Sequence, residues 1–105
     1  YKRQLHTLAR RCQSEGVRLI VVLPPMADNV RTEVCDVFGI TETMQGTVLP
    51  TLATWADECG FTLLDYEWGG SVITDDDKQF FDGFHLDERY GLPEWTQELF
   101  GDIAR

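Results

Sequence analysis

The chain carries little positive charge. It has 9 lysines and arginines against 18 aspartates and glutamates, which gives a formal net charge of −9 at pH 7. Proteins that bind nucleic acid normally present a basic surface, so this composition disfavours a nucleic-acid partner. The basic residues that do cluster are expected on the solvated face of an N-terminal helix; they are Lys2, Arg3, Arg10 and Arg11.

Cysteine is also scarce. The chain has three, Cys12, Cys35 and Cys59, and no C-x-x-C pair. The odd number leaves at least one free thiol, and the redox compartment stays open. Each cysteine falls on the apolar side of an expected helix, which is typical of a small buried hydrophobic residue. A catalytic or metal-bound thiol is the alternative.

Long hydrophobic runs are absent. The longest run, Leu19 to Leu23, is far shorter than the roughly 20 residues that a membrane-spanning helix needs. We therefore expect no membrane insertion in this segment, and no signal peptide is recognisable. Because a helical pattern is already under way at Tyr1, we expect the chain to be a processed product or a piece of something longer.

The remaining composition is that of a globular protein. With 105 residues, 43% of them hydrophobic and 11% aromatic, the chain is expected to form a single domain over residues 1–105. Hydrophobic spacing and the positions of glycine and proline mark the expected elements. These are helices over 2–15, 28–38, 48–59 and 93–104, strands over 17–23 and 61–66, and loops over 40–46 and 68–71.

Two details of these helices depend on single residues. Thr47 is expected to cap the helix over 48–59, with Pro50 in its first turn, where a missing N–H matters little. Gly60 is expected to end the same helix. Apolar residues at helical spacing predict the buried faces of the second and last helices; they include Val30, Val34, Val37, Phe38, Trp95, Leu99 and Phe100.

The order of the elements predicts an α/β protein. Both expected strands are mostly apolar without alternation, which is typical of parallel strands that are covered on both faces. A right-handed crossover would join them. We expect at least two parallel strands with flanking helices, as part of a three-layer α/β/α, doubly wound, flavodoxin-like sheet. Two strands are few for such a sheet, so further strands are expected from an absent N-terminal half, another chain or an unusual edge.

One short stretch carries the candidate chemistry. Asp82 precedes His85 by three residues, with Gly83 between them, so a single turn can bring both side chains together. A carboxylate that holds one imidazole nitrogen protonated frees the other to accept a proton. The stretch follows the second expected strand, and ligands of open parallel sheets bind beyond the carboxyl ends of the strands.

This block resembles a known family. Asp82-Gly83-Phe84-His85, followed by Leu86 and a closing helix, looks like the last block of the SGNH (GDSL-like) hydrolase and acyltransferase superfamily. The likeness is closest to cell-envelope members that handle O-acyl groups on polysaccharides or teichoic acids, and it covers only the C-terminal half of that fold. The resemblance implies His85 as general base, Asp82 as its orienter, an O-acylated small-molecule or polysaccharide substrate, no cofactor, and a cell-envelope, periplasmic or extracellular location.

The blocks that would supply the nucleophile and oxyanion donors in that family are missing from this chain. Ser14 follows no strand, Ser71 lies in a glycine-rich loop, and Asn29 has the setting of a helix cap. A base acts only when a nucleophile lies within hydrogen-bond reach. We therefore expect the isolated chain to show little or no esterase activity, and we expect association with a missing N-terminal half or another copy of the chain.

Other readings of the same residues remain open. Asp82 can be a capping residue and His85 a histidine satisfied by hydrogen bonds. The pair can also join Asp87 and the 75–77 aspartates in a metal site, although no known ligand spacing is present. Trp68 and Phe84 are the candidates for substrate contacts, with a purely structural role as the alternative. A non-catalytic α/β module for binding or assembly is the second hypothesis for the whole chain.

Overall fold

The structure is a computed structural model that describes residues 1–68, 79–82 and 84–105. It divides into two compact units. The first contains Tyr1–Pro24 and Glu42–Gly70, and the second contains Pro25–Thr41 and Ser71–Arg105. Within the described ranges, no helix is both long and apolar enough to cross a lipid bilayer.

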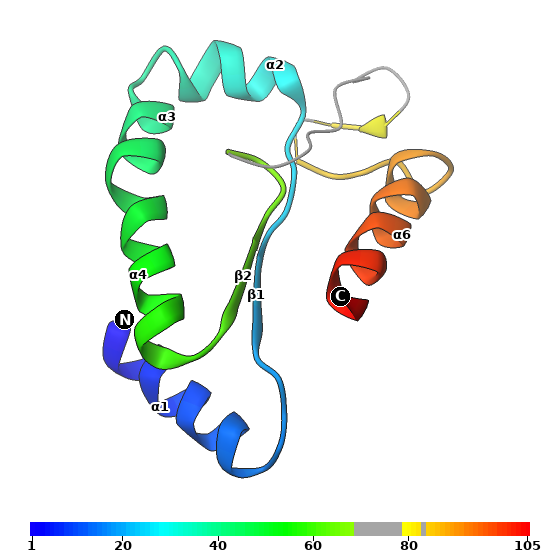
Figure 1. Ribbon diagram of the computed structural model, residues 1–105. Helices are drawn as coiled ribbons and strands as arrows, with labels where there is room; N and C mark the ends of the chain where they lie inside the picture. The colour runs from blue at the N-terminus through cyan, green and yellow to red at the C-terminus, as the bar shows by residue number, and fades with distance from the viewer. Residues whose placement is uncertain (69–78, 83) are drawn as a thin grey trace. The chain divides into compact units, whose positions relative to one another are not determined.

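The first unit is built on two parallel strands, β1 (Ile20–Leu23) and β2 (Thr62–Asp65), which run side by side in Figure 1. Ile20 pairs with Thr62, and Leu23 pairs with Asp65. All residues of both strands are half-buried, so the burial does not alternate along either strand, and neither strand is as fully covered as the sequence predicts. The strands are shorter than expected, but the α/β class is confirmed.

The core of this unit lies between helices and strands. Helix α1 (Lys2–Ser14) packs against α4 (Leu49–Cys59), and Ala9, Cys59 and Phe61 form the buried cluster. Ala9 is completely buried, and its cluster includes Cys59 at the end of α4. An ion pair of 2.7 Å between Lys2 and Glu58 joins the same helices at the surface.

The expected loop over 40–46 is wrong, because the backbone is helical from Ile40 onward. Helix α3 (Ile40–Thr43) continues into the π-helical turn η2 (Met44–Val48) and then into α4. Thr47 therefore lies inside a helix and caps nothing. Pro50 has no N–H and its ring would clash with the carbonyl four residues earlier, and the wider π turn just before it accommodates both constraints. As expected, Gly60 ends the helix, with a φ of 82°.

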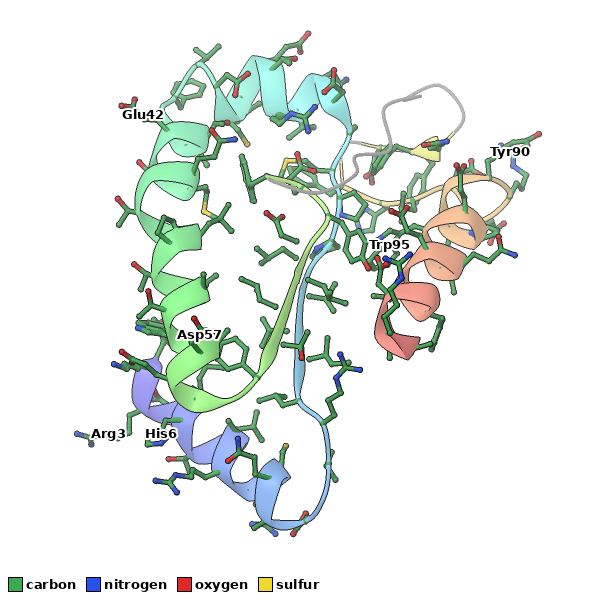
Figure 2. The ribbon with its side chains drawn as sticks, in the orientation of Figure 1. Arg3, His6, Glu42, Asp57, Tyr90 and Trp95 are labelled. Carbon is green, nitrogen blue, oxygen red and sulfur yellow. The ribbon has the colours of Figure 1, made fainter. Side chains whose placement is uncertain are left out.

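The second unit has a small core of its own. Helix α2 (Asp28–Val30) passes into the π-helical turn η1 (Arg31–Cys35), and α6 (Gly91–Ala104) closes the chain. Ala27 and Phe80 are the buried residues of this core; Val30, Leu86 and Trp95 pack against them. Figure 2 labels Trp95 on α6. Helix α6 begins two residues earlier than expected.

Part of the predicted inner faces is wrong. Val37 and Phe38 are 70% and 76% exposed, and Phe100 on α6 is 63% exposed. The π-helical turn η1 explains the exposure of Val37 and Phe38. Its hydrogen bonds join residues five apart rather than four, so the residue that follows Val30 on the inner face is Cys35 and not Val34. Cys35 is accordingly buried, and so is Cys59.

Candidate active site

A tight turn places Asp82 and His85 together. The Asp82 Oδ1 atom accepts the backbone N–H groups of Phe84, at 2.7 Å, and of His85, at 2.8 Å. Short-chain aspartate favours such turns because its carboxylate can bond to the backbone two and three residues ahead. The turn is therefore encoded by a single side chain. Gly83 lies outside the described residues.

Backbone pairing on either side holds this turn in place. Phe80 and Leu86 form an isolated antiparallel bridge. The Phe81 N–H donates to the His85 carbonyl at 3.1 Å, and the Asp87 N–H donates to the Gln79 carbonyl at 2.8 Å. Because Phe80 is buried in the core of the second unit, this short hairpin anchors the turn on packed structure.

The two side chains make the contact that a catalytic orienter and base require. His85 Nδ1 lies 2.7 Å from Asp82 Oδ2 and 2.9 Å from Oδ1. The Phe84 backbone N–H is the main influence that lowers the pKa of Asp82, with further lowering from His85. An ionised carboxylate only accepts hydrogen bonds, so in the neutral form of the imidazole this contact favours the proton on Nδ1 and the lone pair on Nε2.

The imidazole is open to solvent. The His85 side chain is 67% exposed and that of Asp82 is 44% exposed. Phe81 stacks on the imidazole, with ring centroids 5.4 Å apart and planes inclined by 24°. Among the described residues, no group forms a hydrogen bond with Nε2 of His85. The ring is thus oriented on one side by a carboxylate and available on the other.

The other histidine shows a different arrangement. His6 projects from α1, as Figure 2 shows, and its Nε2 lies 3.3 Å from Nε of Arg10. In His6 the hydrogen bond therefore involves Nε2, the ring nitrogen that forms no hydrogen bond with a described residue in His85. His6 has no carboxylate partner among the described residues, which makes it a natural control for His85.

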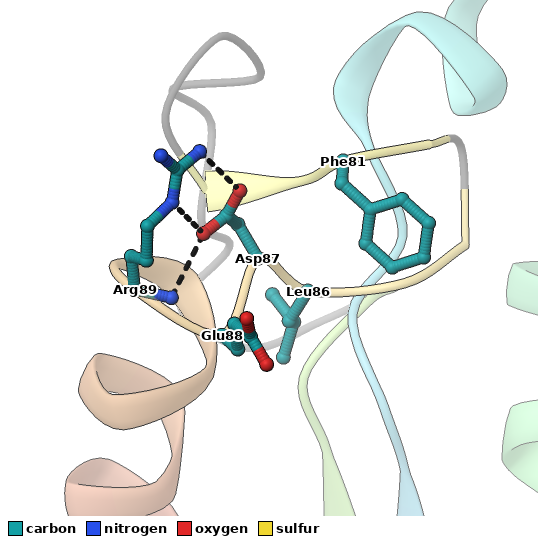
Figure 3. Close-up of a pocket in the computed structure, with 5 residues that line it drawn as sticks. All are labelled: Phe81, Leu86, Asp87, Glu88 and Arg89. Carbon is teal, nitrogen blue, oxygen red and sulfur yellow. Dashed lines mark hydrogen bonds and ion pairs between the residues drawn. The ribbon is translucent and has the colours of Figure 1, made fainter.

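An open depression of about 540 Å³ lies beside the stacked rings. Figure 3 shows its described lining, which consists of Phe81, Leu86, Asp87, Glu88 and Arg89. Arg89 binds Asp87 through Nε to Oδ1 and through Nη2 to Oδ2, both at 3.2 Å. The guanidinium lowers the pKa of Asp87, and the carboxylate in turn raises the pKa of Arg89.

The other predicted site residues have surroundings of their own. Trp68 belongs to the first unit, where its backbone N–H donates to Asp65 Oδ1 at 2.9 Å and its backbone carbonyl accepts from Gln45 Nε2 at 3.2 Å. Phe84 lies in the turn and is 67% exposed, but it is not among the residues that line the depression. The roles of both as substrate contacts stay predictions.

The candidate nucleophiles and metal ligands can also be located in part. The Ser14 hydroxyl donates to the Arg11 carbonyl at 2.8 Å near the end of α1. Ser71 and the 75–77 aspartates lie outside the described residues. In the part of the chain that the structure describes, no three histidine, cysteine or carboxylate side chains gather as a metal site would require. Asp87, one of the metal candidates, is instead bound to Arg89.

Sequence reasoning missed the role of the residues after the turn. The sequence pattern singles out neither Glu88 nor Arg89, and it does not indicate that Phe81 stacks on His85. The adjoining acidic and basic residues of Asp87-Glu88-Arg89 were the available signal. Comparison with known proteins found no family model, curated protein or solved structure that matches this chain.

Proposed function

We propose that this chain is the C-terminal part of an SGNH-like serine hydrolase or O-acyltransferase, in which His85 is the general base and Asp82 orients it. The observation that supports the proposal is the 2.7 Å contact between Asp82 Oδ2 and His85 Nδ1, on a ring whose Nε2 is available. A structural histidine needs no such arrangement on an exposed turn, whereas a general base does.

The chemistry would run through a serine from outside this part of the fold. Nε2 of His85 takes the proton of the serine hydroxyl as its oxygen attacks the ester carbonyl carbon. The imidazolium, stabilised by Asp82, then gives that proton to the departing alcohol, and an acyl-serine remains. Water or an acceptor hydroxyl, deprotonated by the same ring, releases the acyl group. These steps need no cofactor.

The same proposal accounts for the narrow sheet. Parallel sheets seldom consist of two strands, and the pair β1 and β2 would form one side of a doubly wound, three-layer sheet. The remaining strands would come from an N-terminal half that also carries the serine and the oxyanion donors. The resemblance adds the substrate class, O-acylated polysaccharides or small molecules, and a location in the cell envelope.

A fluorophosphonate probe tests this function on the natural full-length protein. Such probes phosphonylate a serine only where a neighbouring base activates it. We expect labelling that His85→Ala abolishes and His6→Ala leaves unchanged. We expect Asp82→Asn to slow labelling by up to about 10⁴, the size of the effect when a triad histidine adopts the wrong tautomer. Labelling that survives His85→Ala would rule out the proposed base.

The exposed apolar residues favour the second candidate function, a non-catalytic assembly module. Val37 and Phe38 are more than two-thirds exposed on the segment after η1. Exposed apolar patches of this kind often contact another protein. If assembly were the function, sedimentation would show oligomers that Phe38→Ser disrupts, and fluorophosphonate labelling would be absent in the full-length protein.

A further inference from the structure

We infer that the depression beside His85 binds the cationic part of an ester, an ammonium group carried a few atoms from the acyl linkage. As a substrate site this inference rests on the proposed function, but ligand binding can be measured without any turnover. The volume of about 540 Å³ falls within the range of small-molecule sites.

The charges around the depression select against anions. The Arg89 guanidinium forms two side-chain bonds to Asp87, so the two groups together are neutral. Arg89 also lies over the Tyr90 ring, with its central carbon 5.5 Å from the ring centroid. Glu88 is exposed and forms no ion pair among the described residues, although its charge also helps to raise the pKa of Arg89. With two carboxylates and one guanidinium, the described lining carries a net charge of −1.

An aromatic ring lies in the same lining. Phe81 is 68% exposed and borders the depression, while its ring also stacks on His85. Aromatic rings attract ammonium groups electrostatically, by about 0.5–1 kcal/mol at exposed sites. A carboxylate and an aromatic ring together are suited to an alkylammonium group, whose charge and methyl groups both find partners. Neither favours a phosphate or a carboxylate ligand.

The position of the depression relates it to the reacting group. The Phe81 and His85 ring centroids are 5.4 Å apart. A ligand whose cation lies against Phe81 can therefore place a group a few atoms away next to the imidazole. This spacing suits compact amino esters, in which a short chain separates the ammonium group from the ester oxygen.

Two ester probes of equal shape separate charge from size. Acetylcholine and 3,3-dimethylbutyl acetate differ only in a positive nitrogen that replaces a carbon, and both can be titrated into the ¹⁵N-labelled chain. We expect acetylcholine to shift the amide signals of residues 81 and 86–89 and to bind about two- to fivefold more tightly than its neutral counterpart. Monomethyl succinate, an anionic ester, should bind more weakly than either.

Variants assign the effect to the lining. Glu88→Gln should remove the preference for acetylcholine, whereas Glu33→Gln, a matched charge change on η1 at an exposed carboxylate, should preserve it. Equal binding of the two isosteric esters, or no shift at residues 81 and 86–89 up to tens of millimolar, would overturn the inference.

The same experiment distinguishes this inference from the proposed function. His85→Ala should leave the affinity for acetylcholine nearly unchanged, because the imidazole is not part of the described lining. Fluorophosphonate labelling without cation binding would leave the base in place and refute the cationic site. Cation binding without labelling would establish the site and refute the acyl-transfer function.

Discussion

A glycine at the start of α6 controls the support of the candidate site. Gly91 is buried, and an ideal Cβ added to it would lie 2.7 Å from the carbonyl carbon and 2.8 Å from the Cα of Gln79. The Gln79 carbonyl accepts the N–H of Asp87, which closes the hairpin that carries Asp82 and His85. A methyl group at position 91 must therefore displace backbone rather than a flexible side chain.

Gly101 in the same helix provides the matched control, because a Cβ there would meet nothing within 4 Å. Gly101→Ala should stabilise the protein by about 0.5–1 kcal/mol, since alanine is the better helix former. Gly91→Ala should destabilise it by about 1–3 kcal/mol, the usual cost of overpacking. Two substitutions that are chemically identical should thus act in opposite directions.

Thermal and urea unfolding, followed by circular dichroism, measure both effects. Each kcal/mol corresponds to a change in Tm of about 4–8 °C for a domain of this size. NMR of the His85 ring in Gly91→Ala would report whether the displaced backbone also disturbs the Asp82 contact, and we expect it to do so. If both alanine variants were stabilised alike, the close approach of α6 to Gln79 would be wrong, and with it the support proposed for the turn.

The remaining predictions concern the turn and its anchors. In Asp82→Asn the amide oxygen can still accept the two backbone N–H groups while the NH₂ donates to Nδ1, so ¹⁵N NMR should show His85 change from the Nδ1–H to the Nε2–H tautomer; an unchanged tautomer would contradict the assigned pairing. Folding lowers the pKa values of Asp82 and Asp87 below the ordinary 3.8, so the stabilisation from both carboxylates should be complete above that pH and disappear as the pH falls through the folded values. Urea midpoints measured against pH should show this loss of stability, and the loss should be smaller in Asp87→Asn. Phe80→Ala should cost about 3–5 kcal/mol in chemical unfolding, and the exposed Phe81 much less when replaced likewise.

Features that depend on neighbouring residues could be predicted from the sequence. One carboxylate and two backbone amides form the Asp82 turn, and these groups lie within four consecutive residues. The end of α4 at Gly60 is equally local, because a φ of 82° is readily adopted only by glycine. The two apolar strands were recognisable because hydrophobic runs between turn signals leave few alternatives.

Features that depend on helix register could not be predicted in this way. The sequence predicts Pro50 in the first turn of a helix, whereas the chain accommodates it within a longer helix by widening the turn over Met44–Val48. The same change of register at η1 turned Val37 and Phe38 outward. A 3.6-residue period cannot show such changes, because one π-helical turn shifts every later residue to another face.

The depression beside the turn arises from pairing between residues that are not adjacent. Leu86 borders it because the bridge to Phe80 fixes the returning strand, and Asp87 borders it because its N–H is held by Gln79. The sequence showed the charges of Asp87-Glu88-Arg89 but not that they would gather beside an aromatic ring. The contact between Asp82 and His85 was thus predictable, whereas the lining of the depression was not.

Removing the imidazole separates a functional histidine from a structural one. The Asp82 turn is closed by two backbone N–H groups, so it does not depend on the His85 ring, whose side chain is 67% exposed. His85→Ala should therefore change the free energy of unfolding by no more than about 0.5 kcal/mol, the usual range for surface positions. Urea unfolding of this variant beside His6→Ala would measure it. A loss of several kcal/mol would show that the histidine serves the fold and would contradict the proposed role as a base, whereas unchanged stability is the result that the proposal expects.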